Sequence, residues 1–271
     1  MKTDYVQAEI INDSSSEEEY ILTKKPKKLK ITKPKIQHEI LKRCLNDDEK
    51  IIEIGVDEAG RGPLFGRVYT AAVILPKDDS FDYSKVKDSK KFHSKKKIEE
   101  AAEYVKENAL AWSVTYADEK KIDEVNILQA TQLSMHNSIG DVCKLYNKLS
   151  RVNSPIRIEK IDYNFNLLID GNYFNPITTF NKETNKIETI PYTTVEGGDN
   201  KFASIAAASI LAKVERDKYI DKLCQENPEL IEYYGIDSNK GYGAKRHLDG
   251  IKEHGITIWH RRTFAPCKNY I

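Results

Sequence analysis

The chain has 271 residues, enough for one large domain or two small ones with a sizeable hydrophobic core. Charged residues make up 31% of it, yet the formal net charge is +1, so the molecule as a whole is not a polycation. The four cysteines are scattered without a Cys-x-x-Cys pair and indicate neither a zinc knuckle nor a disulfide framework. The sequence also lacks a membrane-spanning apolar run and signal-peptide order, so we expect an intracellular, cytoplasmic protein without a membrane partner.

The first 37 residues have the composition of a disordered, low-complexity tail. An acidic patch, Ser14–Glu19, is followed by a basic run, Lys24–Lys30. That run is compatible with a nuclear localisation signal, with a loose nucleic-acid-binding arm, or with a tail that only solvates the protein. We expect residues 38–50 to form a short helix that leads into the folded domain.

The next stretch combines a buried strand with two acids and a glycine turn. Residues 51–56 are rich in β-branched side chains, which is typical of a strand buried on both faces. The strand ends in Asp57 and Glu58, and burying two carboxylates is unfavourable unless a cation or a proton compensates their charge. The turn Gly60-Arg61-Gly62-Pro63 and a second apolar strand, residues 69–75, follow. This order of buried strand, acid pair, glycine turn and strand favours a divalent metal site.

Periodicity predicts the remaining elements, and strands alternate with helices, which indicates a mixed α/β domain. The predicted elements are a helix over 95–108, a strand over 109–116, a long helix capped by Asp123, a strand over 166–169, a β-hairpin within 177–195 that turns near 182–185, and a helix from Ser204. The stripe of the long helix that includes Met135 and Ile139 is assigned to the core.

Two further acids follow predicted elements in the same way. Asp170 ends the strand over 166–169, and Asp199 precedes the helix that starts at Ser204. Each acid alone has an ordinary explanation: Asp199 caps a helix, Asp170 belongs to a turn, or Glu58 pairs with Arg61. As one cluster, four carboxylates would repel each other unless divalent cations were bound. Ligands that are all oxygen suit Mg²⁺ or Mn²⁺ better than zinc.

At these residues the sequence resembles type 2 ribonuclease H, the ribonuclease HII family. The motifs that carry the resemblance are Gly55 to Pro63, Lys87-Asp88-Ser89-Lys90-Lys91, Ile169-Asp170-Gly171-Asn172, Gly198-Asp199 with Ser204 to Asp217, Gly241 to Lys245 with His247, and His260 to Pro266. They occur in the family's order and span residues 51–267. Three departures are a longer segment between Asp170 and Asp199, Thr263 where a serine is expected, and the additional N-terminal tail.

The resemblance implies a ribonuclease H-like mixed central sheet flanked by helices, with residues 38–271 as the catalytic domain. It implies an endonuclease that hydrolyses the RNA strand of RNA–DNA hybrids, including ribonucleotides embedded in duplex DNA, in replication and repair. Its metal-binding and catalytic acids fall on Asp57, Glu58, Asp170 and Asp199. Two Mg²⁺ or Mn²⁺ ions would assist hydrolysis and leave 5′-phosphate and 3′-hydroxyl ends. We expect a monomer.

The resemblance places ribose recognition on Gly60, Arg61 and Gly62, and contact with the adjacent sugar on Tyr242. Two basic segments, 84–97 and 240–271, are rich in Lys and Arg. Within them and their neighbourhood, the candidates for phosphate contacts are Lys90, Lys91, Lys245 and Arg261. An ordinary solvated surface explains these four side chains equally well.

Other functions remain open at this point. A nucleotide-binding enzyme would use the glycine turn for phosphates, but Phe65 occupies the third glycine position of G-x-G-x-x-G, and Asp57 and Glu58 would repel a pyrophosphate there. A hybrid-binding module without catalysis and a nuclease that acts on plain DNA are the remaining alternatives.

Overall fold

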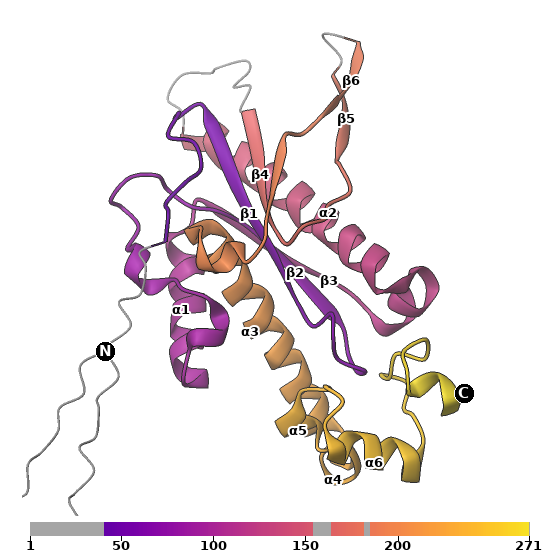
Figure 1. The fold of residues 1–271 in the computed structure, drawn as a ribbon. Coiled ribbons are helices and arrows are strands. Elements are labelled where there is room, and N and C mark those ends of the chain that lie inside the picture. Colours follow the sequence, from indigo (N-terminus) through magenta and orange to yellow (C-terminus); the bar gives the residue numbers. More distant parts are fainter. Residues whose placement is uncertain (1–40, 154–163, 182–184, 271) are drawn as a thin grey trace, which may run out of the picture. The chain divides into compact units, whose positions relative to one another are not determined.

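The computed structural model describes residues 41–153, 164–181 and 185–270 (Figure 1). The predicted tail, residues 1–37, and its basic run Lys24–Lys30 lie outside the described residues. The described part belongs to one compact unit, residues 39–271. None of its helices is long and apolar enough to cross a lipid bilayer.

A five-stranded mixed sheet forms the centre of this unit, in the strand order β3-β2-β1-β4-β7 (Figure 1). Its strands are β1 (Ile51–Ala59), β2 (Val68–Ile74), β3 (Ala111–Ala117), β4 (Asn164–Asp170) and β7 (Tyr192–Val195). The pairs β1–β2 and β2–β3 are antiparallel, whereas β1–β4 and β4–β7 are parallel. The strand β1 is therefore central, which explains why residues 52–57 are buried without the alternation of an edge strand.

Helices cover both faces of the sheet (Figure 1). On one face, α1 (Lys95–Asn108) and α3 (Ala203–Glu226) pack on β2 and close a core rich in alanine. On the other face, α2 (Glu119–Asn153) packs Met135, Ile139 and Val142 against β1 and β4. The small residues of α3 let its first turns lie directly on β1: a Cβ on Gly55 would come within 2.2 Å of the Ser204 backbone.

The C-terminal segment builds a smaller core around Phe65. It contains α4 (Glu229–Tyr234), α5 (Ile236–Asn239), α6 (Lys245–His254) and the 3₁₀ turn η4 (Cys267–Tyr270). The other 3₁₀ turns are η1 (Tyr83–Lys85), η2 (Ser89–Lys91) and η3 (Gly198–Asn200). An antiparallel bridge joins Phe65 to His260, so this segment is tied to the chain just before β2.

The predicted mixed α/β architecture is confirmed, and the helix over 95–108 has the predicted bounds. The hairpin predicted within 177–195 forms as β5 (Thr178–Asn181) and β6 (Lys186–Thr189), while β7 joins the central sheet instead. The strand predicted over 109–116 runs over 111–117, because the Ala109 N–H still donates to the Val105 carbonyl and ends α1.

Two local predictions are wrong. No helix forms within residues 41–50; Lys42 instead makes a bridge with Phe202, just before α3. The helix α2 breaks at Asn126, whose φ of 67° is not helical. Asp118 caps the short first part by accepting the Lys121 N–H at 2.8 Å, and Asp123 lies inside that part. Asn126 caps the long part by accepting the Gln129 N–H at 3.1 Å. The Asp123 carboxylate has a long-range role that its sequence neighbours do not reveal: it accepts the N–H groups of Arg262 and Thr263, each at 2.9 Å.

Candidate active site

Parallel pairing of β1 and β4 brings the first two acids together. The last residues paired in register are Val56 and Ile169, so Asp57 and Asp170 follow side by side on strands that lie about 4.8 Å apart. Val56 and Ile169 pack into the core beneath α2. Because side chains alternate along a strand, Asp57 and Asp170 point to the opposite face, where α3 begins.

The third clustered acid, Asp199, lies in η3, which precedes α3. The backbone N–H of Gly198 donates to Asp170 Oδ1 at 2.6 Å, which fixes the start of η3 against the end of β4. Asp199, the next residue, is buried, with 3% of its surface exposed. The structure therefore brings Asp57, Asp170 and Asp199 to one edge of the sheet, with Glu58 beside Asp57.

The electrostatics show that Asp57 and Glu58 share one environment with Asp170. Burial raises the pKa of Asp57 well above its ordinary value, and the charges of Glu58 and Asp170 raise it further. Burial also raises the pKa of Glu58; Arg61, whose guanidinium lies 3.2 Å from Glu58 Oε1, opposes this effect, and Asp170 adds to it. Protein groups alone do not compensate the negative charge of this cluster.

A second set of contacts surrounds Asp199. Burial raises the pKa of this carboxyl, Asp88 and Asp170 raise it further, and Lys90 partly offsets the rise from 3.4 Å away. The Asn200 amide bridges Asp88 and Asp199, at 3.2 and 3.1 Å. Sequence reasoning did not single out Asp88 and Asn200 as site residues, although Asp88 lies within the Lys87–Lys91 motif.

Ser209 on α3 is another neighbour that sequence reasoning missed. Its hydroxyl hydrogen-bonds the Asp57 carboxylate and thereby opposes the rise in the pKa of that group. The same hydroxyl lies 3.0 Å from that of Ser89, so the Lys87–Lys91 motif reaches Asp57 through two buried serines. A serine within the apolar half of a helix was the only signal in the sequence.

The glycine turn and Tyr242 lie next to each other. Arg61, Gly62 and the Tyr242 side chain are exposed, and a Cβ on Gly62 would lie 3.4 Å from the Tyr242 ring. The ring therefore faces the turn at Gly62, where the absence of a side chain leaves room for it. The sugar-recognising roles of the turn and of Tyr242 stay predictions.

The basic candidates separate into exposed and buried side chains. Lys90 and Lys91 are exposed and reach Asp199 and Asn200, respectively. Lys245 is 90% exposed and pairs with Asp249 on the same helix. Arg261 is fully buried, so a contact with substrate phosphate, as the sequence suggested, is wrong for this residue.

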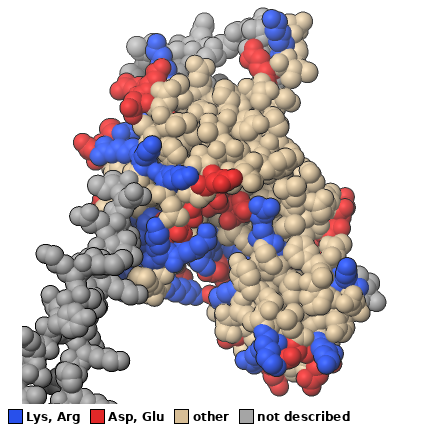
Figure 2. Space-filling view, viewed as in Figure 1, with Lys and Arg blue, Asp and Glu red and all other residues tan. Residues whose placement is uncertain are grey.

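The residues present fit hard divalent cations. The donor set is four carboxylates: the Asp170 charge raises the pKa values of Asp57, Glu58 and Asp199, and Arg61 and Lys90 only partly offset the rise at Glu58 and Asp199. Within residues 41–153, 164–181 and 185–270, no three His, Cys, Asp or Glu side chains stand in a preformed metal-binding geometry. In this geometry Asp170 and Asp199 accept hydrogen bonds from Gly198 and Lys90 instead. Figure 2 shows acidic surface in the middle of this face with Lys and Arg side chains beside it.

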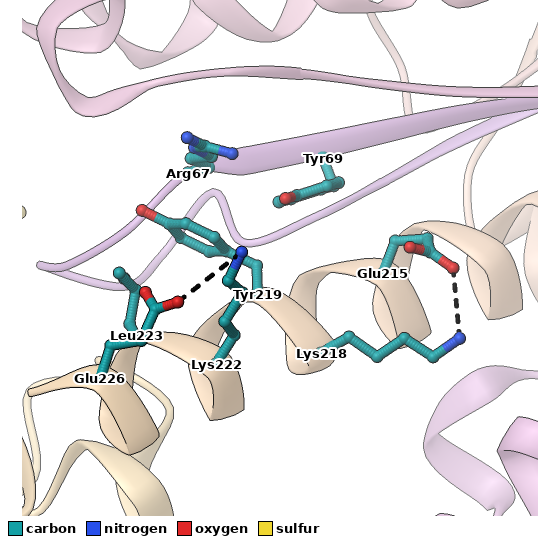
Figure 3. Close-up of a pocket in the computed structure, with 8 residues that line it drawn as sticks. All are labelled: Arg67, Tyr69, Glu215, Lys218, Tyr219, Lys222, Leu223 and Glu226. Atoms are coloured by element: carbon teal, nitrogen blue, oxygen red, sulfur yellow. Dashed lines mark ion pairs between the residues drawn. The ribbon is translucent and has the colours of Figure 1, made fainter.

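A separate hollow of about 370 Å³ lies between the start of β2 and the second half of α3 (Figure 3). The Arg67 guanidinium is stacked there near the rings of Tyr116 and Tyr219, at 4.0 and 4.4 Å. The lysines on its wall pair with glutamates of α3, Lys218 with Glu215 and Lys222 with Glu226. None of the four clustered acids lines this hollow, which is therefore distinct from the candidate active site.

The chain is similar in sequence to known proteins. The family model described as Ribonuclease HII matches residues 54–267. A ribonuclease HII from Bacteroides thetaiotaomicron is 44% identical over 220 residues, which cover 81% of this chain and 92% of that protein.

Two solved structures share the fold. The ribonuclease H2 from Pyrococcus horikoshii has a TM-score of 0.54 and 22% identity, covering 80% of this chain and 96% of that one. Bst-RNase HIII in complex with Mn²⁺ has a TM-score of 0.51 and 20% identity, covering 82% of this chain and 69% of that one. At these identities the likeness concerns the fold alone.

Proposed function

The chain belongs to the ribonuclease HII family and is a ribonuclease H, and we propose that it cuts RNA strands of RNA–DNA hybrids, and ribonucleotides embedded in duplex DNA, with a pair of Mg²⁺ or Mn²⁺ ions. The proposed ligands are Asp57, Glu58, Asp170 and Asp199. One observation carries the proposal: β1, β4 and η3 bring these acids to one edge of the sheet with their charges incompletely compensated. We further propose that it acts as a monomer.

Bound at these carboxylates, two divalent cations would supply an activated water and would stabilise the leaving oxygen of an in-line phosphodiester displacement. The protein's own groups prepare this chemistry. The Ser209 hydroxyl and the Glu58 N–H, which lies 2.7 Å from Asp57 Oδ1, orient the Asp57 carboxylate. The Gly198 N–H orients Asp170 in the same way, and Lys90 faces Asp199 as an exposed cation at the edge of the site.

Recognition of RNA requires a contact with the 2′-hydroxyl, the group that distinguishes RNA from DNA at a given position. We assign this contact to the backbone of the Gly60-Arg61-Gly62 turn, which is exposed at Arg61 and Gly62, where a sugar can approach closely. Tyr242 would stack on the neighbouring deoxyribose and leave no room for a second 2′-hydroxyl. Lys90, Lys91 and Lys245 would hold phosphates without reading bases.

Cleavage of a matched set of duplexes tests the proposal. The set contains one ribonucleotide, four ribonucleotides, a full RNA–DNA hybrid, or DNA only, each with Mg²⁺, Mn²⁺ or EDTA. We expect cuts that leave 5′-phosphate and 3′-hydroxyl ends at ribonucleotides, none in the all-DNA duplex and none in EDTA. Binding of the hybrid without cleavage would support a non-catalytic module, and cleavage of all-DNA duplex would support a general nuclease.

The substitution Asp57→Asn tests the site itself. We expect it to abolish cleavage while duplex affinity changes little, because the carboxylate acts on the cations and not on the duplex. Without metal, the variant should unfold at a higher temperature than the native protein, since a buried charge beside Glu58 and Asp170 is removed. Asp79→Asn, at an acid that is 89% exposed, is the control and should leave cleavage unchanged. Unchanged turnover in Asp57→Asn would contradict the metal-binding role.

A further inference from the structure

The buried guanidinium of Arg261 touches the glycine turn from the inside. It donates to four backbone carbonyls of residues 60–66: Gly60 at 2.6 Å, Arg61 at 2.9 Å, Pro63 at 2.7 Å and Gly66 at 2.8 Å. No carboxylate of the described residues is within ion-pair distance of it. Burial lowers the pKa of this group to about 9, so holding a cation here is unfavourable by itself. The four converging carbonyls are what makes an arginine suitable at this position.

These contacts fix the direction of the peptide planes in the turn. In a trans peptide the C=O of one residue and the N–H of the next point in opposite directions. Because the carbonyls of Gly60 and Arg61 point inward to Arg261, the N–H groups of Arg61 and Gly62 must point outward. Both residues are exposed, and among the described residues neither N–H has a hydrogen-bond acceptor. Two adjacent free N–H groups form a small concave site for an oxygen atom.

His260, the neighbour of Arg261, supports the other half of the same surface. The Thr257 N–H donates to His260 Nδ1 at 2.9 Å, so the ring proton of His260 is on Nε2. That N–H points to His247 Nε2 at 3.0 Å, and His247 Nδ1 in turn donates to the Tyr242 carbonyl at 2.9 Å. The Thr257 N–H at one end of this chain of bonds and the Tyr242 carbonyl at the other therefore determine which atom donates in each hydrogen bond. The buried dipeptide His260-Arg261 thus contacts the backbone of the glycine turn directly and is linked to the backbone of Tyr242 through His247.

From these contacts we propose that Arg261 is a positioning residue for ribonucleotide recognition: it turns the Arg61 and Gly62 N–H groups toward the 2′-hydroxyl, in a frame shared with Tyr242 through His260. The inference rests on the proposed function. It explains why a cationic side chain in the last motif lies away from the substrate and still determines which substrate is selected.

The test measures the ratio of two affinities of the protein, one for a duplex that contains a single ribonucleotide and one for the all-DNA duplex of the same sequence. It is measured with the full-length chain in an Asp57→Asn background, so that the ribonucleotide stays intact. In Arg261→Lys, a compact ammonium with three donors cannot span four carbonyls, whereas the charge is kept. We expect the ratio to fall about 10-fold, equal to about 1.4 kcal/mol, while affinity for DNA alone changes less than twofold.

Two further variants separate positioning from loss of stability. Val142→Ala removes buried methyl groups from the core-facing side of α2, on the opposite face of the sheet, and should lower the melting temperature while keeping the ratio. Arg261→Gln keeps two N–H donors without the charge and should lower the ratio at least as much as Arg261→Lys. A native ratio in a folded Arg261 variant would overturn the proposal, as would a failure of both Arg261 variants to fold, since the residue would then serve folding alone. If the Asp57→Asn protein with Arg261 intact shows no preference for the ribonucleotide, the proposed function fails instead.

Discussion

The contact between Gly55 and the start of α3 makes a quantitative prediction. An added Cβ would lie 2.2 Å from the Ser204 carbonyl carbon, and the neighbouring backbone atoms are at 2.4 and 2.5 Å. Ordinary contact begins at 3.4 Å, so in Gly55→Ala the helix must move from β1 by about 1.2 Å. Backbone atoms on both sides leave no flexible side chain to absorb this movement.

The displaced helix is the one that carries Ser209 to Asp57 and follows directly after Asp199. A misplacement of about 1 Å at a catalytic centre can lower turnover about 100-fold, and overpacking of a core costs about 1–3 kcal/mol. We therefore expect Gly55→Ala to reduce cleavage of a duplex with one ribonucleotide by about two orders of magnitude. Its melting temperature should fall by several degrees, measured by circular dichroism.

The control is a second glycine-to-alanine change in the same chain. Gly140 lies inside α2 with nothing within 4 Å of an added Cβ, so Gly140→Ala should stabilise the protein by about 0.5–1 kcal/mol and leave cleavage unchanged. If Gly55→Ala retained native turnover and a native melting temperature, the close packing of α3 on β1 could not be what positions the site.

Two more predictions concern the C-terminal part of the site. Tyr242→Ala should weaken discrimination at the RNA–DNA junction more than it weakens binding to plain DNA, because the ring supplies shape and not charge; an equal loss on both duplexes would count against stacking on the sugar. Burial lowers the pKa of His260 to about 3, whereas the unfolded chain takes up this proton near pH 6.5, so stability must fall as the pH falls below that value. Between pH 7.5 and 5.0 the free energy of unfolding should fall by about 2 kcal/mol, measured by urea unfolding. The variant His260→Gln should lose most of this pH dependence. The control His93→Gln, at an exposed residue, should retain it. The same dependence in both variants would show that other groups cause it.

The sequence by itself determined the frame of the site. Helix α1 follows from apolar periodicity, whereas strand β1 and the start of α3 follow from continuous runs of apolar or small residues; both signals are local. The positions of Asp57 and Asp170 at the ends of buried strands were also readable. The cluster was predicted from the chemistry of four carboxylates, whereas the parallel pairing that places the ends of β1 and β4 at one edge of the sheet is given by the structure.

Only the tertiary structure decided what the polar side chains outside these strands do. Arg261 reads as a surface cation in the sequence, yet it is buried because its four carbonyl partners lie about two hundred positions earlier in the chain. Asp123 reads as a helix cap, yet it holds the backbone of Arg262 and Thr263. A hydrogen bond depends on distance in space, and no local pattern encodes a partner that the fold brings from the other end of the molecule.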